Sequence, residues 1–498
     1  MERKINIFRV VSVCLLCAVL LIGCGNNESA SSDEENGAFP LSIMINFHTP
    51  EVPDEKVLNL VEEATNTDVE IQWVPDNTYS ERLQSAFATS SLPDVVFMKS
   101  DSFMQFKEGI RDGQFWEVGP YLDQFENLSK LNEEVLKNTM VDGKLYSLYQ
   151  ARPLSRQGMI YRKDWADALG LDAPKNTDEF YDMLKAFTEE DPDGNGAKDT
   201  IGLTDRNDVI YGAFDTIASW FGAPNNWGEQ DGQLLPDFMS PEYMDTLTFF
   251  RDLHSNGYIN QDFPVTSKSD QQELFKNGTA GVYVGSMGDV QGLYEDAKAL
   301  NPEVVLDVHN QVKGPDGEFQ VWSIPGYNKV ILFPKSAVES EEELLKILGF
   351  LDELMNPELS NLLQWGIEGE HYKVTDGKAE AIASPQVLDT EVSAYKMIEV
   401  GGPESNGRYE GYFSYEPQTK AEELYKDNAE HLVTDPTVRL ESPTYVERGE
   451  RLDQIMLDAT YKFIIGQLDE AGYEKAIEEW KEEGGDQIIE EYNASNEG

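Results

Sequence analysis

The chain has 498 residues, of which 40% are hydrophobic and 11% aromatic, which is enough for sizeable cores and for more than one domain. It carries 92 acidic but only 39 basic residues, giving a formal net charge of −53. Such a charge repels nucleic acid and anionic lipid headgroups at long range, so both are excluded as partners, and it is typical of a protein kept soluble outside the cell.

The first 23 residues have the pattern of a bacterial lipoprotein signal peptide. A basic leader precedes an apolar run and a small residue: Arg3, Lys4, Arg9, residues 10–22 and Gly23. A transmembrane anchor needs about 20 apolar residues, and this run is shorter. We therefore expect cleavage before Cys24, acylation of Cys24 with palmitate, and a lipid anchor on the outer face of the cell membrane.

The cysteine count indicates the same location. The only cysteines are Cys14, Cys17 and Cys24, so the processed body would have no free thiol. Disulfides and redox catalysis are therefore excluded. Residues 24–39 follow as a polar stretch without a helical or apolar pattern until its last residue, and we expect a flexible tether there.

From residue 40 onward, short apolar runs alternate with amphipathic windows. Strands are predicted at 41–47, 69–74 and 94–98, with helices near 54–64 and 79–89 between them. This alternation favours an α/β fold with a mainly parallel sheet and helices on its faces. No repeat of 20 to 50 residues is visible, which argues against a solenoid or propeller.

Several motifs resemble one known family. The longest is RKDWADALGLDAPKNTDEFYDMLKAFTEEDPDGNGAKDTIGL at 162–203, and further matches in family order lie at 92–95, 220–224, 275–281 and 366–372. Together they resemble the extracellular family 1 solute-binding proteins, the lipoprotein subunits of carbohydrate importers driven by ATP hydrolysis. The resemblance covers essentially the whole processed chain.

The resemblance implies a two-lobe fold of the periplasmic-binding-protein type, class II. Each lobe would hold a mixed or mostly parallel sheet flanked by helices, with hinge crossings and a ligand cleft between the lobes. We expect residues 40–155 with 280–335 to form the N-terminal lobe. Residues 156–279 with 336–498 would form the C-terminal lobe.

The loop after the predicted helix near residue 180 has the spacing of a calcium loop of the EF-hand type. Oxygen ligands fall at positions 1, 3, 5, 7 and 9, and Gly196 stands at position 6, where the turn is sharp. Position 12 is Gly202 rather than glutamate, so Thr200, Glu190 or water would complete the site. The alternative is a solvated turn. We expect a structural Ca²⁺ held by Asp191, Asp193, Asn195, Ala197, Asp199 and Thr200; in the alginate-binding relatives the matching loop carries calcium, with Glu at the place of Thr200.

Ligand-binding candidates were chosen for the chemistry of sugars, whose apolar faces stack on aromatic rings and whose hydroxyls need polar partners. The candidates are Trp220, Phe221, Asn226, Trp227, Trp322, Trp365, Arg152, Glu368 and His371. The alternative for each tryptophan is a place in the core, and we expect that place for Trp165 and Trp480. For Glu368, between two glycines, the alternative is capping of a turn.

Enzyme motifs are absent: the sequence has no HExxH, no GxSxG and no Walker A motif, and its five histidines show no metal-ligand spacing. We therefore expect no catalytic residue. The chain would be a monomeric, lipid-anchored protein that captures an oligosaccharide or glycan fragment and delivers it to the permease subunits of an ABC transporter. The alternatives are a secreted glycan hydrolase and a sensor subunit that presents its ligand to a signalling partner.

Overall fold

A computed structural model describes residues 37–49, 51–209 and 212–496. Phe39–Gly498 forms one compact unit, separate from Met1–Ala38. The expected signal peptide and the expected lipidation site Cys24 lie outside the described residues. No helix in the described ranges is long and apolar enough to cross a membrane.

The first of two main sheets has five strands in the order β2-β1-β3-β12-β4. β1 is parallel to both β2 and β3, whereas β12 is antiparallel to both β3 and β4. Ile43, Met44 and Ile45 of β1 are all fully buried, because helices cover both faces of this part of the sheet. The strands are β1 Phe39–Phe47, β2 Thr67–Pro75, β3 Val95–Lys99, β4 Ser147–Ala151 and β12 Tyr327–Leu332.

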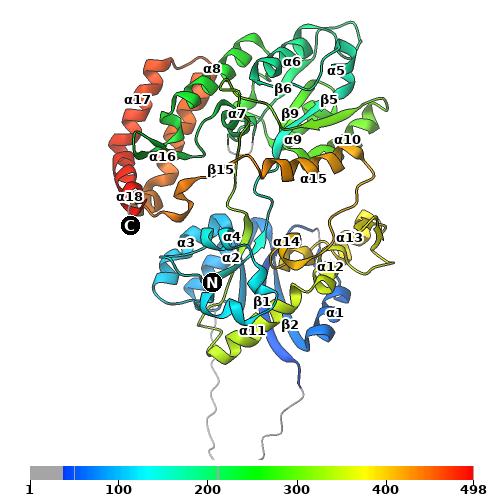
Figure 1. The fold of residues 1–498 in the computed structure, drawn as a ribbon, viewed down its shortest axis with the longest axis vertical. Coiled ribbons are helices and arrows are strands. Elements are labelled where there is room, and N and C mark those ends of the chain that lie inside the picture. Colours follow the sequence, from blue (N-terminus) through cyan, green and yellow to red (C-terminus); the bar gives the residue numbers. More distant parts are fainter. Residues whose placement is uncertain (1–36, 50, 210–211, 497–498) are drawn as a thin grey trace, which may run out of the picture. The chain divides into compact units, whose positions relative to one another are not determined.

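The helices packed with this sheet come from two separate parts of the chain, 56–138 and 341–406, and Figure 1 shows α1, α11 and α12 beside β1 and β2. α11 starts after Ser340, whose hydroxyl accepts a hydrogen bond from the backbone N–H of Glu343 at 3.2 Å. We call this sheet with its helices the first lobe. Its helices are α1 Lys56–Thr65, α2 Asp76–Ala88, α3 Ser100–Arg111, α4 Glu133–Asn138, α11 Glu341–Leu354, α12 Pro357–Trp365, α13 Pro385–Glu391 and α14 Pro403–Asn406.

The second lobe is built around a four-stranded sheet in the order β10-β5-β9-β6. β5 is antiparallel to β10 and to β9, and β6 is parallel to β9. These strands are β5 Gln157–Arg162, β6 Ile201–Thr204, β9 Ala280–Ser286 and β10 Leu306–His309. The helices of this lobe are α5 Lys163–Leu169, α6 Thr177–Glu189, α7 Ala213–Phe221, α8 Pro241–Asn256, α9 Lys268–Lys276, α10 Val290–Leu300, α15 Glu416–Asn428, α16 Pro443–Ile464, α17 Glu470–Trp480 and α18 Asp486–Asn496.

Three small two-stranded sheets complete the described fold. They are β7 Trp227–Gln230 with β8 Gln233–Pro236, β11 Val321–Trp322 with β15 Leu432–Val433, and β13 Tyr372–Thr375 with β14 Lys378–Ala381. The chain passes between the lobes three times, at 152–156, 323–326 and 407–415. Two such lobes with several connections are the architecture expected from the resemblance.

The division of the chain between the lobes differs from the expected boundaries. β9 and β10 lie within 280–335, which we expected in the first lobe, but they pair with β5 in the second sheet. α11 and α12 lie within 336–498, which we expected in the second lobe, but they pack into the core of the first. A buried apolar strand such as GVYVGS carries no signal for which sheet it joins, so local pattern could not assign it.

Candidate functional site

A cavity of about 1160 Å³ is lined from both lobes. Pockets for drug-sized ligands hold roughly 300–1,000 Å³, so this cavity has room for a larger molecule. Its wall consists of α4 and the residue before it, two of the three crossings, and helices, strands and loops of the second lobe. The lining segments fall within 132–138, 152–157, 206–226, 268–289, 321–325 and 432–439.

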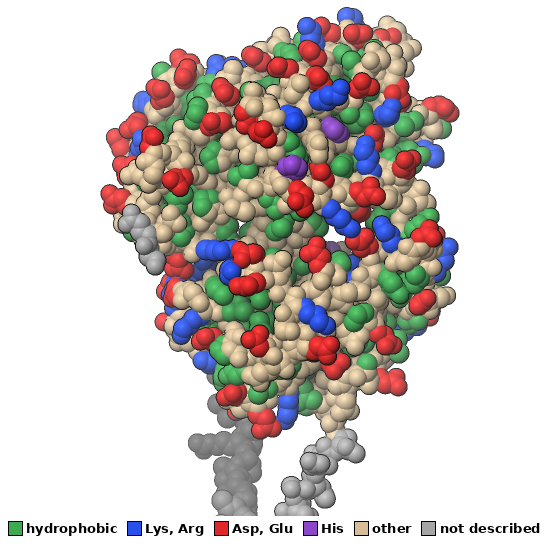
Figure 2. All heavy atoms as spheres, in the orientation of Figure 1, with side chains coloured by type: hydrophobic (Ala, Val, Ile, Leu, Met, Phe, Trp, Pro, Cys, Tyr) green, Lys and Arg blue, Asp and Glu red, His purple; other side chains and the backbone are tan. Residues whose placement is uncertain are grey.

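The charge of the cavity wall differs from that of the whole chain. Five cationic side chains line it, as many as the acidic ones, although acidic residues outnumber basic ones 92 to 39 overall. Figure 2 shows how densely Asp and Glu cover one face of the molecule. The cationic residues are Arg152, Arg156, Arg206, Lys268 and Arg439, and the acidic ones are Glu134, Asp208, Asp215, Asp289 and Asp435.

Several of these acidic groups are neutralised locally. Ion pairs join Arg206 to Asp208 at 3.1 Å, Lys268 to Asp289 at 3.4 Å and Arg439 to Glu134 at 3.0 Å. Burial raises the pKa of Asp215 well above its usual value and also raises the pKa of Asp435, which favours their neutral forms. The cavity wall therefore repels an anionic ligand less than the net charge of the chain suggests.

The crossing at 152–156 places two arginines on the wall. The backbone N–H of Arg152 donates to the carbonyl oxygen of Gly326 at 3.0 Å, which joins this crossing to the one at 323–326. The Arg156 side chain makes no hydrogen bond or ion pair within the described residues, and it is partly buried. Its guanidinium therefore offers a planar, permanently charged donor to a ligand.

Three polar atoms of residues on the same wall are buried and have no hydrogen-bond partner among the residues that the structure describes. They are Ser155 Oγ, Gln157 Oε1 and Thr216 Oγ1. Buried polar groups are nearly always hydrogen-bonded, to protein, water or ligand.

Three of the nine ligand-binding candidates line this cavity: Arg152, Asn226 and Trp322. Asn226 Nδ2 donates to Asp435 at 3.1 Å. Trp322 is 8% exposed, and its indole N–H donates to the carbonyl oxygen of Ala223 at 2.8 Å. That bond fixes the ring, so one edge is committed to the protein and only a small part of the ring faces the cavity.

Three other aromatic candidates belong to the core of the second lobe instead. Trp220 is 1% exposed and meets Phe180 edge-on with ring centroids 5.3 Å apart, while Trp227 meets Tyr492 edge-on at 4.9 Å. Phe221 is partly buried against the same core. α7 is buried on nearly all sides, so its terminal aromatic residues pack inward. The core positions expected for Trp165 and Trp480 are confirmed.

The last three candidates, Trp365, Glu368 and His371, lie in the first lobe between α12 and β13 and do not line the cavity. The indole N–H of Trp365 donates to the carbonyl oxygen of Tyr409 at 3.0 Å. Glu368 is exposed, next to a turn, and His371 is fully buried. The sequence therefore grouped residues that the fold separates.

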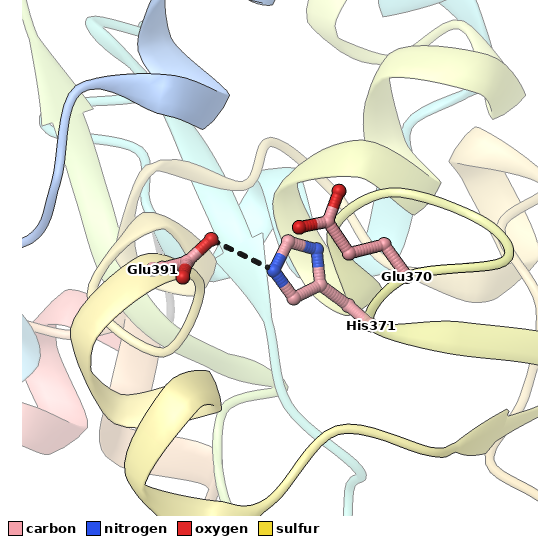
Figure 3. A group of neighbouring side chains, drawn as sticks. All are labelled: Glu370, His371 and Glu391. Carbon is pink, nitrogen blue, oxygen red and sulfur yellow. Dashed lines mark hydrogen bonds and ion pairs between the residues drawn. The ribbon is translucent and has the colours of Figure 1, made fainter.

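His371 belongs to a charged cluster shown in Figure 3. Its Nδ1 accepts a hydrogen bond from the backbone N–H of Ile367 at 2.9 Å, so the ring proton is on Nε2, which donates to Glu391 at 3.1 Å. Lys56 forms ion pairs with both Glu370 and Glu391, and the hydrogen bond to Glu370 raises the pKa of Lys56. The Nδ1 atom of His371 already accepts a hydrogen bond, and Lys56 lies between the two carboxylates. The cluster is therefore a group of ion pairs that links α1 to α13.

The expected calcium loop folds around Asn195. Its side-chain Nδ2 donates to Asp193 at 2.8 Å and to Asp199 at 3.2 Å, and the backbone N–H groups of Asn195 and Gly196 donate to Asp191 at 3.1 and 2.9 Å. Gly196 has φ +84°, as a sharp turn at this position requires. Two exposed carboxylates thus accept from the side-chain amide of Asn195 and a third from backbone N–H groups beside it, and this set of oxygen atoms fits a hard cation.

Thr200 does not share the environment of the other expected calcium ligands. It is 4% exposed, and its hydroxyl donates to the carbonyl oxygen of Phe187 at 2.7 Å. The residues from Asp193 to Asp199 are exposed, so Thr200 anchors the end of the loop to α6. Thr200 therefore does not replace the glutamate that an EF-hand loop has at position 12.

Sequence reasoning missed Arg156, Thr216, Glu134 and Arg439, which all line the cavity. Arg156 lies four residues after Arg152, within the same crossing, so a recognised crossing would have pointed to it. The others lie on elements whose approach to the cavity depends on the packing of the lobes, and their local sequence carries no signal.

Comparison with known proteins shows which family the chain belongs to. A family model described as bacterial extracellular solute-binding protein matches residues 51–358. The polygalacturonan/rhamnogalacturonan-binding protein YtcQ of Bacillus subtilis is 41% identical over 498 residues, covering 98% of each chain. Lipoprotein LipO of the same organism is 35% identical over 491 residues, covering 96% of each.

Solved structures share the fold. A human-milk-oligosaccharide (HMO) binding solute-binding protein from Bifidobacterium longum infantis superposes with TM-score 0.74 at 17% identity, covering 92% of this chain and 98% of the other. The alginate-binding protein AlgQ2, solved without calcium ion, superposes with TM-score 0.67 at 17% identity, covering 93% and 98%. On the family match and the two Bacillus relatives, the chain belongs to the bacterial extracellular solute-binding proteins.

Proposed function

We propose that the chain captures an acidic, pectin-type oligosaccharide in the large cavity and delivers it to the permease of an ABC transporter. The observation that carries the proposal is the wall of this cavity, which holds five cationic side chains in a protein of net charge −53. Galacturonate units carry one carboxylate per ring, which guanidinium groups bind by paired hydrogen bonds. The name of the 41% identical relative supports the same ligand class.

The mechanism is binding without a change in covalent bonds. The ligand contacts α4 and the crossings on one side and second-lobe loops on the other, so it favours the arrangement in which both walls meet it. A hydrolase and a sensor would give different results from a transport protein in binding and uptake measurements. Shorter sugars released from the ligand would indicate a hydrolase, and uptake independent of permease subunits would contradict delivery.

A structural calcium ion in the 191–199 loop is part of the proposal. The fit of Asp191, Asp193, Asn195, the carbonyl of Ala197 and Asp199 supports it. When bound, the ion would neutralise carboxylates that are now satisfied by N–H donors. Glu190 or water would complete the shell, because Thr200 is committed to Phe187.

Location and assembly complete the proposal. A lipid on Cys24 anchors the chain on the outer face of the membrane, and the protein acts there as a monomer. The signal-like residues 1–23 and the 35% identity to a lipoprotein support the anchor. Size-exclusion chromatography with light scattering tests the monomer.

Calorimetry with oligogalacturonides of two to six units, and with neutral cello-oligosaccharides of equal length as controls, tests the ligand class. We expect saturable binding of the acidic series alone. Arg156→Gln should weaken it about tenfold, since a hydrogen bond to a charged group contributes about 1.5–3 kcal/mol. Arg448→Gln is the matched control, because Arg448 is exposed on α16 and outside the cavity. Binding of the neutral series alone would contradict the proposed ligand.

A further inference from the structure

The first sheet has a second place suited to a ligand, outside the large cavity. In the order β2-β1-β3, the chain leaves β1 toward β2 on one side and returns to β3 on the other. The connections that follow β1 and β3 therefore run in opposite directions, and ligands in open α/β sheets bind beyond the carboxyl ends of the strands at such a point. The elements at this edge carry His48, Asp76, Lys99 and Lys329.

The outer part of this edge is a partly exposed hydrogen-bonded group centred on Asp76. Its carboxylate accepts from Asn46 at 2.7 Å and from Lys99 at 3.1 Å, and His48 Nε2 lies 3.8 Å from it. Asn46 is 1% exposed, and its Oδ1 has no partner. Within the described residues, the group therefore contains one hydrogen-bond acceptor without a partner, Asn46 Oδ1, beside Lys99, which is paired with Asp76.

Lys329 lies directly behind this group. It is the register partner of Lys99 across the β3–β12 pairing and is 1% exposed. Its ammonium contacts Met397 Sδ at 3.2 Å, and within the described residues no carboxylate oxygen lies within 4 Å of it. A thioether is a weak acceptor, so the ammonium is buried without a counter-charge in contact with it.

Met397 also lines a small cavity of about 190 Å³. It is lined by His48, Thr49, Asp389, Ser393 and Met397. Met397 thus touches both this cavity and the Lys329 ammonium, and methionine, with three rotatable bonds, adapts easily. The volume suits one terminal sugar unit rather than an oligosaccharide.

We propose that this edge is a carboxylate-binding subsite, in which the Lys329 ammonium pairs with the carboxylate of one uronic acid unit after Met397 moves aside. Lys99 adds positive charge at the entrance, and Asn46 Oδ1 accepts from a neighbouring hydroxyl. The proposal rests on the proposed function for the class of ligand. The subsite goes beyond the proposed function because it assigns a second charged contact to the ligand, away from the arginines of the large cavity.

The subsite has a distinctive pH dependence. Burial lowers the pKa of Lys329 to about 7, with Lys99 acting in the same direction and Asp76 against it. His48 and Asp389, on the cavity wall, are the other titratable groups facing this edge. A carboxylate binds the charged form, so the contribution of the subsite is present below about pH 7 and is lost above it. Arginines stay charged throughout this range.

Calorimetry with a galacturonic acid trisaccharide and its methyl ester, at pH 6.0 and 8.5, tests the subsite. The full chain should prefer the acid, with the preference falling about tenfold between these pH values as Lys329 loses its proton. In Lys329→Met the preference should already be about tenfold lower at pH 6.0 and should not change with pH. Lys335→Met, a lysine exposed three residues after β12, is the control that keeps the fall above pH 7.

Asp76→Asn keeps an acceptor for Asn46 and Lys99 but removes the charge that raises the pKa of Lys329, so the preference for the acid should fall at a lower pH than in the unmodified chain, which can be measured even if Lys329→Met fails to fold. An unchanged pH dependence of the preference in both variants, or in Asp76→Asn alone if only that variant folds, would overturn the subsite while leaving the large cavity as the ligand site. If the unmodified chain binds neither acid nor ester, the proposed function itself is wrong.

Discussion

Arg439 of the second lobe donates through Nη2 to Glu134 on α4 of the first lobe, at a distance of 3.0 Å. The same guanidinium donates through Nε to Asn138 at 2.9 Å. All three residues also line the large cavity. The two lobes are therefore joined across the cavity by side chains as well as by the three crossings, and this contact must break if the lobes separate.

Glu134→Gln should shift the ligand-free protein toward a more open arrangement. The side chains of the pair are 46% and 66% exposed, so the contact contributes about 0–1 kcal/mol, and the closed population should fall by at most about fivefold. Small-angle scattering at low salt measures the change. Glu133→Gln is the matched control, because within the described residues Glu133 forms an ion pair with Lys137 and none with the second lobe. A radius of gyration equal to that of the unmodified protein in both variants would contradict a role in closure.

Asp193→Asn should abolish stabilisation by calcium. An ion that binds only the folded state raises the free energy of unfolding by about 2.7 kcal/mol at one hundred times its dissociation constant. We expect the melting temperature of the unmodified chain to rise with calcium and fall with chelator, and that of Asp193→Asn to stay constant. Asp182→Asn, exposed on α6, should behave like the unmodified chain. A melting temperature insensitive to calcium in the unmodified chain would identify the loop as an ordinary turn.

The local parts of the fold could be predicted from the sequence. Strands expected at 41–47, 69–74 and 94–98 correspond to β1, β2 and β3, because apolar runs between turn residues are a local signal. The assignment of segments to lobes failed for β9 and for α11. Which sheet a buried strand joins depends on pairings between residues far apart in the chain, and a single sequence does not record them.

The candidate site could be predicted only in part for a related reason. Arg152 and Asn226 are polar residues near crossings and loops, and the fold brings them to the cavity wall. Trp220 and Trp227 lie in loop-like sequence of the same kind, with polar residues nearby, but in the fold neighbouring aromatic rings bury them. Lys329 lies in an apolar strand where its charge looks like a solvated edge, and only the structure reveals its burial.

Cys24→Ala should release the protein from membranes, because a signal of this type leaves the acylated cysteine as the only anchor. Fractionation of cells with labelled palmitate measures both the location and the lipid. Cys17→Ser is the matched control, since residue 17 would be removed with the signal. Continued labelling of the Cys24→Ala variant would show that another residue carries the lipid.

Trp227→Ala should destabilise the second lobe without changing the affinity of the folded protein. Trp227 is 8% exposed and packs against Tyr492, and truncation of a buried tryptophan costs about 3–5 kcal/mol. Thermal unfolding and calorimetry with an oligogalacturonide, at a temperature where the variant is folded, separate the two effects. Weaker binding with an unchanged melting temperature would return Trp227 to the ligand site.

Asp205→Asn should stabilise the protein more at pH 8 than at pH 5. Asp205 is 2% exposed, its Oδ1 accepts from the backbone N–H of Ala213 at 2.9 Å, and burial raises its pKa to about 7. In the unfolded chain the group ionises near pH 3.8, so between these values the folded state holds a proton that the unfolded state has lost.

The stability that this proton provides is complete below pH 3.8 and disappears as the pH rises through about 7, a difference of up to about 4 kcal/mol at about 1.4 kcal/mol per unit. Asparagine keeps the acceptor for Ala213 and does not ionise, so the gap in melting temperature between Asp205→Asn and the unmodified chain should widen from pH 5 to pH 8. Asp245→Asn, exposed on α8, should show no such widening. A gap that stays constant across this range would mean that Asp205 is ionised in the folded protein throughout, its charge stabilised by Arg206 and by the backbone N–H groups around it.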